Sequence, residues 1–333
     1  ESVDDILNDL HVTSLERVFP EAGEHEARTR AAGLHRWYVL GFASEEDLDK
    51  AAERLADVAE ISKVQFRTRL YRASDCKTYP FQATANGQTR ALVTADFNDP
   101  NLFWQWHYIN NADQAVATTS VAGADINVAD AWKLTAGNPE VIVAIVDEGV
   151  KYTHPDLAAN MWINPNPSPE YKNQDIHGWN FAADGPISWG QKGDSGHGTH
   201  VAGTVAAVNN NGIGVCGIAG GDGTPGSGVR LMSCQIFDEA GRDAATIEEI
   251  MVWTADHGAV ISQNSWTYVP GLPDLSQSGK AAIDYFIEYA GCDENGNQTG
   301  PMKGGIVIFA AGNDGISDPV FPGAYEKVVA VAS

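Results

Sequence analysis

The chain has 333 residues, of which 43% are hydrophobic and 20% are charged, and its formal net charge at pH 7 is −23. This balance predicts a globular protein that buries a sizeable core in one large domain or two ordinary ones. The negative charge argues against a nucleic acid or an anionic membrane surface as a partner, and no uncharged apolar run approaches the roughly 18–20 residues that span a bilayer.

Residues 1–73 are predicted to form a small α/β domain. The run 35–43 has the aromatic and β-branched content of a strand, and Ser44 is predicted to cap a helix with Glu46 and Asp47 in its first turn. The other predictions for this part of the chain are a strand within 61–72 and a polar linker over 74–98.

Residues 99–333 are predicted to form a second α/β domain, built on a parallel sheet. Four apolar runs are bounded by turns and lack the alternation of a half-exposed strand, which is typical of strands covered on both faces. Helical patterns alternate with these runs, which predicts a doubly wound α/β fold with function at the carboxyl ends of the strands. The predicted strands are 141–147, 229–237, 259–266 and 305–312, and the predicted helices lie near 125–137, 200–208, 244–257 and 279–290.

Asp147 ends the first of these strands, directly before Glu148 and Gly149. A carboxylate at the carboxyl end of a buried strand lies where this fold class places reacting groups. An Asp that only caps a strand-end turn is the commoner explanation of this feature taken alone. Both interpretations stay open on the residue pattern.

Two histidines, His197 and His200, lie three residues apart in the run 194–208, where Ser195 is predicted to cap a helix that begins near His197. Their spacing allows a metal pair, but no HExxH pattern or obvious third ligand accompanies them. One histidine acting as a base and the other as a packed structural residue is the better assignment. A zinc site is therefore not expected here.

The four cysteines are too few and too scattered for a disulfide scaffold, and none belongs to a CxxC pair. Cys216 and Cys234 lie in apolar runs and are predicted to be buried free thiols rather than a bridge. The other two are Cys76 and Cys292.

Three motifs in order carry a resemblance to a known family. They are AIVDEGV at 144–150 with THPDL behind it, GHGTHVAGTVAA at 196–207, and FAAGNDG at 309–315. Together these motifs resemble the subtilisin-like serine peptidases (subtilases, peptidase family S8), over roughly residues 99–333. The resemblance implies a subtilisin-like fold and serine endopeptidase activity on a protein or peptide substrate.

The resemblance also implies roles for three catalytic residues. Asp147 matches the family's catalytic Asp, which orients the imidazole and stabilises its protonated form. His197 matches the general base that takes the serine proton and returns it to the leaving amine. Asn313 matches the oxyanion-hole Asn, whose side-chain amide donates to the tetrahedral oxyanion. Taken alone, Asn313 is equally well explained as a turn residue.

A substrate-binding strand is implied at Ser265, Trp266 and Thr267, against which a peptide pairs as an added β-strand. The family usually has Gly where Thr267 stands, so the entrance to the P1 pocket differs here. Asp314 follows the oxyanion Asn and, pointing inward, would favour a basic or polar P1 side chain. Phe237 ends the strand that flanks the P2 and P4 pockets. Its apolar ring predicts that the substrate has apolar residues at P2 and P4.

A calcium site is implied by the loop 209–215, which resembles the family's calcium loop after the helix of the catalytic His. Oxygen ligands from a flexible loop together with two carboxylates suit Ca²⁺. An Asn- and Gly-rich surface turn is the alternative explanation of the loop. The implied ligands are the side chains of Asn211, Asp156 and Asp99 and the backbone carbonyls of Asn209, Ile213 and Val215.

Residues 1–73 resemble the inhibitory propeptide of the family, in the form found in large secreted subtilases of Bacteroides-type bacteria. Such a propeptide helps the catalytic domain to fold, and its C-terminal tail blocks the cleft until it is cut. We therefore interpret the chain as an unprocessed zymogen, with its own propeptide domain as a partner, that is secreted or lies in the bacterial cell envelope. An unrelated packing or targeting module is the alternative.

The nucleophile that the resemblance implies is absent from the chain. The family's serine lies in a Gly-Thr-Ser-Met-Ala motif well beyond the oxyanion Asn, whereas this sequence contains no Gly-Thr-Ser triplet, and Ser333 closes a strand-like run. We interpret the chain, which opens at Glu1 without a leader, as a peptidase domain that is incomplete at its C-terminal end and inactive without the missing portion of the same protein. Two alternatives stay open, a non-catalytic subtilase-like peptide-binding protein and a metal-binding or structural module.

Overall fold

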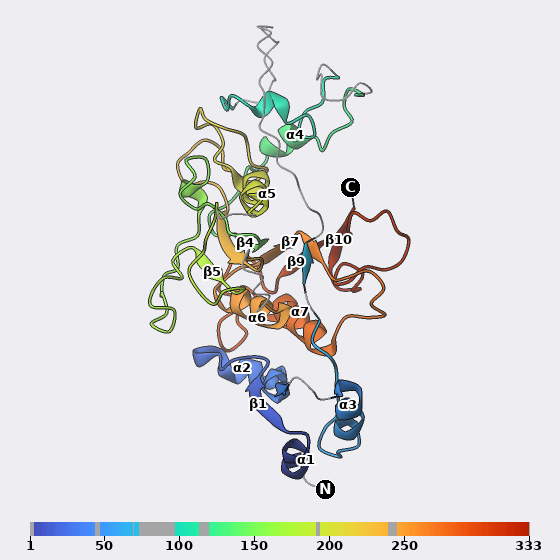
Figure 1. Cartoon of the computed structure of the whole chain (residues 1–333). Coiled ribbons are helices and arrows are strands. Elements are labelled where there is room, and N and C mark those ends of the chain that lie inside the picture. Colours follow the sequence, from blue (N-terminus) through green and yellow to red (C-terminus); the bar gives the residue numbers. More distant parts are fainter. Residues whose placement is uncertain are drawn as a thin grey trace.

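A computed structural model of the chain describes residues 3–43, 47–68, 70–72, 97–112, 120–190, 194–238 and 245–332. Its centre is a six-stranded sheet in the order β10-β9-β7-β4-β6-β5, in which all neighbouring strands are parallel (Figure 1). The strands are β4 (Ile142–Asp147), β5 (Gly178–Asn180), β6 (Arg230–Gln235), β7 (Ile261–Asn264), β9 (Ile306–Ala310) and β10 (Val329–Val331).

The parallel α/β fold expected from the sequence is therefore confirmed. The four predicted strands all form, each with slightly shorter bounds than the apolar runs that predicted them. Strand β5 was not predicted from the sequence, because its three residues, Gly178–Asn180, contain no apolar run. It joins the sheet by pairing with β6.

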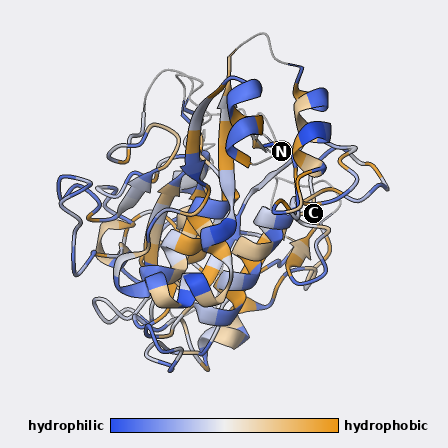
Figure 2. Cartoon of the chain, turned by 90° about the horizontal axis from the view of Figure 1, so that it is seen from below, coloured by the Kyte–Doolittle hydropathy of each residue, from blue (hydrophilic) through white to orange (hydrophobic). Residues whose placement is uncertain are grey.

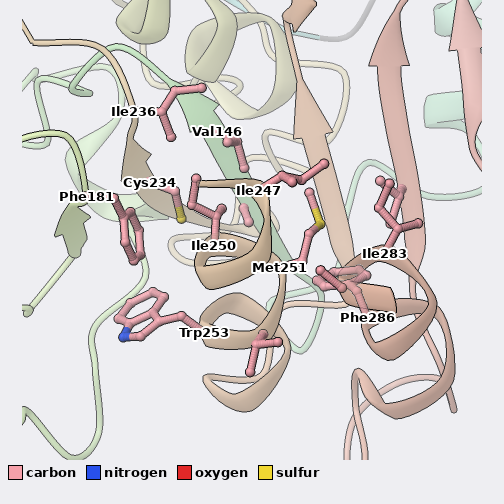
Figure 3. Close-up of a cluster of buried hydrophobic side chains, with 14 of the residues drawn as sticks. Val146, Phe181, Cys234, Ile236, Ile247, Ile250, Met251, Trp253, Ile283 and Phe286 are labelled. Carbon is pink, nitrogen blue, oxygen red and sulfur yellow. The ribbon is translucent and has the colours of Figure 1, made fainter. Parts of the chain in front are cut away.

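The central strand β4 is buried on both faces, which is the reason for its continuous apolar sequence. Ala144 and Val146 pack in one cluster with residues of α6 (Ile247–Asp256) and α7 (Gln277–Tyr289). Val143 and Ile145 pack in a second cluster with residues of α5 (His197–Ala206). Because consecutive side chains of a strand point to opposite faces, helices cover the sheet on both sides. Figure 3 shows the first cluster, with Ile247, Ile250 and Met251 of α6 beside Val146 and Cys234.

Helices α6 and α7 begin at capping side chains. Thr246 precedes α6 and its hydroxyl accepts a hydrogen bond from the backbone N–H of Glu249, and Ser276 caps α7 by accepting from the N–H of Gly279. Such caps satisfy N–H groups that have no partner within the helix. The predicted helix near 125–137 is shorter, as α4 (Val128–Trp132). The 3₁₀ turns are η1 (Gly23–His25), η2 (Leu34–Arg36), η3 (Leu102–Trp104) and η4 (Ala158–Asn160).

The interior of the molecule is apolar and its surface is largely polar. Seen from below in Figure 2, hydrophobic residues concentrate in the central strands and helices, and hydrophilic residues colour much of the surrounding loops. Among the described residues, no helix is both long enough and apolar enough to cross a membrane. Cys216 and Cys234 are buried free thiols, as predicted, and Cys292 is a third, whereas Cys76 lies outside the described residues.

An N-terminal unit, residues 3–58, has a small core of its own. Strands β1 (Val12–Arg17) and β2 (Tyr38–Phe42) pair antiparallel. Helices α1 (Val3–Asp9) and α3 (Leu48–Ala56) contribute to the same hydrophobic cluster, and α2 (Glu26–Ala31) lies between the two strands in the sequence. The buried members of that cluster are Ile6, Leu10, Ala51, Leu55 and Val58.

Two expectations for this part of the chain are wrong. Helix α3 begins at Leu48, and its cap is Asp47, which accepts a hydrogen bond from the N–H of Lys50, whereas Ser44 and Glu46 lie outside the described residues. Residues 61–68 form no strand and do not pair with β1 or β2 of the N-terminal unit. Instead, Gln65 hydrogen bonds to the start of α7, accepting from the N–H of Gln277 and donating to Ser278. Most of the expected linker, residues 73–96, lies outside the described residues.

The N-terminal unit lies next to α6 and α7, with α2 facing them (Figure 1). A buried arginine of α2, Arg28, makes contacts with both helices. Arg28 is 4% exposed and forms an ion pair with Asp256 at the end of α6, at 2.5 Å. It also donates to the hydroxyl of Tyr285 on α7 and to the backbone carbonyls of Cys292 and Asp293. A buried charge needs this full set of partners to offset the loss of water.

We predict that Arg28→Met weakens the attachment of the N-terminal unit, because it leaves the carboxylate of Asp256 buried beside an apolar side chain. Breaking a buried pair costs about 3–5 kcal/mol. Urea unfolding followed by fluorescence and by limited proteolysis of the N-terminal unit measures the effect. Arg30→Met is the control: its ion pair with Glu26 involves a guanidinium side chain that is 56% exposed, so at most about 1 kcal/mol is expected. Equal losses in the two variants would contradict the prediction.

Candidate active site

The carboxyl end of β4 carries two consecutive carboxylates. Asp147 is the last residue of the strand and is 1% exposed, and Glu148 follows it at 3%. The backbone N–H of Glu148 donates to Oδ1 of Asp147 at 2.7 Å. The strand is flanked by β6 and β7, so the position of Asp147 is set by hydrogen bonds on both sides of β4.

His197 is the first residue of α5, and its imidazole contacts Asp147. Nδ1 lies 2.8 Å from Oδ1 and 2.9 Å from Oδ2 of the carboxylate. With the proton on Nδ1 donated to Asp147, the neutral ring has Nε2 as its basic nitrogen. The side chain of His197 is 26% exposed, so the ring is open to solvent on one side. This arrangement fits an imidazole oriented to act as a general base.

The contact depends on a close approach of helix and strand. A Cβ atom on Gly198, the second residue of α5, would lie 2.2 Å from the backbone oxygen of Glu148. Glycine is therefore required where the helix crosses the end of β4. Farther along the same helix, Gly203 has no heavy atom within 4 Å of the corresponding position, so it has no such constraint.

The start of α5 differs from the sequence expectation. The cap residue is Gly196, with φ of 72°, and not Ser195. The hydroxyl of Ser195 donates to Glu148 at 3.0 Å, and Glu148 accepts from the backbone N–H of His197, also at 3.0 Å. The side chain of Glu148, which follows β4, thus caps the start of α5. The sequence analysis did not assign this role. The only signal for it is a second carboxylate directly after Asp147.

His200 lies one turn along α5 and is exposed. Burial of His107, together with the charge of His200, lowers the pKa of His107. Within the described ranges there is no group of three or more His, Cys, Asp or Glu side chains that could hold a metal ion. The two histidines of α5 therefore have different surroundings, and only His197 contacts a carboxylate at the end of β4.

Asn313 and Asp314 lie on the exposed loop that follows β9. Strand β9 runs parallel to β4 with β7 between them. Because parallel strands end at the same edge of a sheet, this loop leaves the sheet on the side where Asp147 meets His197. The loop turns at Gly312, whose φ of 95° favours glycine.

Two of the three residues expected to form a substrate-binding strand, Trp266 and Thr267, form strand β8 (Trp266–Thr267), which follows β7 directly. Trp266 is fully buried against Phe309 and Tyr268, and its indole N–H donates to Asn264. The Trp266 side chain therefore belongs to the core. A strand that pairs with β8 would do so through the backbone of β8.

A segment of the chain itself pairs with β8. Strand β3 (Tyr71–Arg72) runs antiparallel to it, with Tyr71 opposite Thr267 and Arg72 opposite Trp266. Among the residues of 61–72 that the structure describes, these two alone form part of the expected strand, and their partner is β8 and not a strand of the N-terminal unit. Backbone pairing of this kind is how an extended peptide adds to a sheet edge.

Phe237 lies just after β6 and is 9% exposed, packed within the main core cluster. The side-chain amide of Gln235 donates to its backbone carbonyl. Its ring therefore contributes mainly to the core, and the residues that follow, 239–244, lie outside the described residues.

Asp99 and Asp156 lie beside the loop 209–215 and are 5% and 3% exposed. Asp156 accepts hydrogen bonds from the N–H of Val215 and the amide of Asn211, and Asp99 accepts from the N–H of Asn211 at 3.3 Å. Burial, with the negative charge of Asp99 adding to it, raises the pKa of Asp156. The amide of Asn209, 1% exposed, bonds the carbonyl of Gly221. The backbone N–H of Ile213 donates a hydrogen bond to the side-chain oxygen of Asn211.

Comparison with known proteins assigns the chain to a family. A sequence model described as "Subtilase family" matches residues 138–333. Thermitase from Thermoactinomyces vulgaris is 32% identical over 209 residues, which cover 62% of this chain and 60% of thermitase. Neuroendocrine convertase 2 from Bos taurus is 29% identical over 329 residues, which cover 94% of this chain and 44% of the convertase.

A solved structure shares the fold. The crystal structure of fervidolysin from Fervidobacterium pennivorans, described as a keratinolytic enzyme related to subtilisin, superposes with a TM-score of 0.54 at 20% identity. The superposition covers 98% of this chain and 40% of fervidolysin. The chain spans about half the length of the curated relatives it matches.

We predict that Gly198→Ala pushes α5 away from β4, because its methyl group meets the backbone of Glu148. Forcing a methyl group into a packed contact costs about 1–3 kcal/mol. Gly203→Ala on the same helix is the control and is expected to stabilise by up to about 1 kcal/mol, since it adds a better helix former in open space. Chemical denaturation of both variants measures the difference. If the two variants are equally stable, the close approach does not constrain the helix.

Proposed function

The chain belongs to the subtilase family, and from this we propose that it is part of a secreted serine endopeptidase in a zymogen-like form. The observation that carries the proposal is the contact of His197 Nδ1 with both carboxylate oxygens of Asp147 at the carboxyl edge of a parallel sheet. This pair can activate a hydroxyl nucleophile and has no evident use in a protein that only binds peptides.

In the proposed mechanism, Asp147 holds the imidazole and stabilises its positive charge when His197 takes the proton of the nucleophile. His197 then returns the proton to the leaving amine. Asn313 donates its amide to the oxyanion of the tetrahedral intermediate, a contribution worth roughly 10²–10³ in rate. We assign the nucleophilic serine to a Gly-Thr-Ser motif, which the 333 residues do not contain. We therefore propose that this chain alone is inactive.

The proposed substrate is an extended polypeptide that pairs with β8. The antiparallel pairing of Tyr71–Arg72 with Trp266–Thr267 supports this, because it is a strand addition made by the chain itself. It also supports the zymogen-like form, since residues that join the N-terminal unit to the sheet use the same backbone groups that a substrate would use. The neighbouring Asp314 is exposed and available to a basic or polar side chain.

Export from a bacterial cell is part of the proposal. A net charge of −23 over 333 residues suits a protein that works outside the cell without phosphate-bearing partners. The packing of the N-terminal unit on α6 and α7 through Arg28 supports the proposal that this unit is a propeptide, which assists folding before it is removed.

We predict that a form extended to include the serine-bearing segment, with residues 1–72 cleaved off, hydrolyses an unfolded protein substrate. His197→Ala is expected to lower kcat/KM on the order of 10⁴–10⁶-fold, because nothing else removes the nucleophile's proton. His200→Ala, an exposed histidine on the same helix, is the control and keeps activity. Substrate binding without turnover in every form would instead favour the peptide-binding protein.

A structural calcium ion is proposed between Asp99, Asp156 and the loop 209–215. Two buried carboxylates lie here with like charges and no cationic side chain among the hydrogen bonds described for them. A Cβ on Gly214 would lie 2.0 Å from Oδ2 of Asp156, so the loop wraps the carboxylate closely. Carboxylate, amide and backbone oxygens form the donor set that Ca²⁺ prefers.

We predict that calcium raises the Tm of the chain and that Asp156→Asn abolishes the rise. Asp293→Asn, in an exposed Asx turn, is the control and leaves the rise intact. Because the pKa of Asp156 is raised, the calcium-dependent gain is lost as pH falls through a range above that of an ordinary Asp. Without calcium, Asp156→Asn is expected to be at least as stable as the parent, since a like-charge contact is removed. A rise in Tm that survives in Asp156→Asn would exclude this site.

A further inference from the structure

Glu148 is a buried carboxylate that the mechanism above does not use. It is 3% exposed and follows Asp147 directly at the end of β4. A buried carboxylate is costly unless its oxygens are hydrogen bonded, so its partners indicate why it is kept at this position.

The hydrogen-bond partners described for Glu148 lie at the start of α5. Its Oε2 accepts from the backbone N–H of His197 at 3.0 Å, and its two oxygens lie 3.0 and 3.1 Å from the hydroxyl of Ser195. The same hydroxyl lies 3.3 Å from the N–H of His197. The cap residue of the helix, Gly196, has no side chain with which to satisfy this N–H.

We propose that Glu148 is a positioning residue for His197, fixing its main chain while Asp147 fixes its ring, and supplying a second negative charge that favours the imidazolium. The inference rests on the proposed peptidase function. The last residue of β4 and the residue after it thereby hold the side chain and the main chain of one histidine. The main chain of His197 can then shift only if its hydrogen bond to Glu148 breaks.

The titratable groups that contact His197, or that lie within three residues of it along the chain, come from three elements. Asp147 and Glu148 come from the end of β4, Asp194 comes from the turn before α5, where it accepts from the N–H of Gly196, and His200 lies on the next turn of α5. Of these, only Asp147 contacts the ring and only Glu148 contacts the main chain of His197 in the hydrogen bonds described. A negative charge near an imidazole raises its pKa, so loss of the Glu148 charge lowers the pKa of His197.

The test is a pH titration of the His197 ring by NMR in the intact 333-residue chain, with isotope-labelled histidine and the signal assigned from its absence in His197→Gln. Glu148→Gln keeps an oxygen acceptor and the shape of the side chain but removes the charge. Glu148→Ala removes both. Asp175→Asn is the control: Asp175 is another fully buried carboxylate that accepts from a backbone N–H and a side-chain amide, those of Ser168 and Asn164, away from the site.

The expected result is a fall of about 0.5–1 unit in the titration midpoint of His197 for both Glu148 variants and none for Asp175→Asn. Hydrogen exchange of the His197 amide is expected to speed up in Glu148→Ala and to stay slow in Glu148→Gln, whose oxygen still accepts. An unchanged midpoint in Glu148→Gln, or an amide equally protected in both variants, would overturn the inference.

Activity separates this inference from the proposed function. In the complete, processed protein, Glu148→Gln is expected to move the acid limb of kcat/KM to lower pH by the shift seen in the titration, and Glu148→Ala to lower kcat about tenfold or more at every pH. If the complete protein hydrolyses no peptide but the titration shifts as described, the proposed function fails and the contact between Glu148 and His197 stands. If the protein is active and the acid limb does not move, the positioning role fails alone.

Discussion

The burial of β4 on both faces is the constraint on which the rest of the structure depends. Because Val143 and Ile145 pack toward α5 while Ala144 and Val146 pack toward α6 and α7, the strand has no freedom to shift its register. The carboxylates that follow it are therefore held at a defined point of the sheet edge. The helices that bury the strand also bring His197 to that point, so packing and site geometry have one origin.

The acidic side chains of this chain fall into two groups, exposed and buried. Most contribute to a surface charge of one sign, whereas a few are buried and fully engaged by hydrogen bonds. Asp147 and Glu148 are engaged by the start of α5, and Asp256 by Arg28. In each case a buried charge joins two elements that are distant in the sequence, because only partners from both elements together offset its loss of water.

Two of the contacts that connect the N-terminal part of the chain to the sheet and its helices join segments far apart in the sequence. Arg28 joins the unit to α6 and α7, and Tyr71–Arg72 adds a strand to β8. Neither contact has a local cause in the sequence. A strand within 61–72 was expected as part of the N-terminal α/β domain, but the paired residues that the structure describes there, Tyr71 and Arg72, lie against β8, because strand propensity does not select a partner.

The sequence by itself determined the parallel sheet, the bounds of its long strands to within a few residues, and the candidate residues Asp147, His197 and Asn313, since apolar runs and motifs are local. It could not determine the roles of Glu148, whose partners lie 47 to 49 positions away along the chain. It also placed the caps of α3 and α5 wrongly. Only the tertiary structure decided these points, because a hydrogen-bond partner is chosen by which elements meet in space, and that depends on packing of the whole chain.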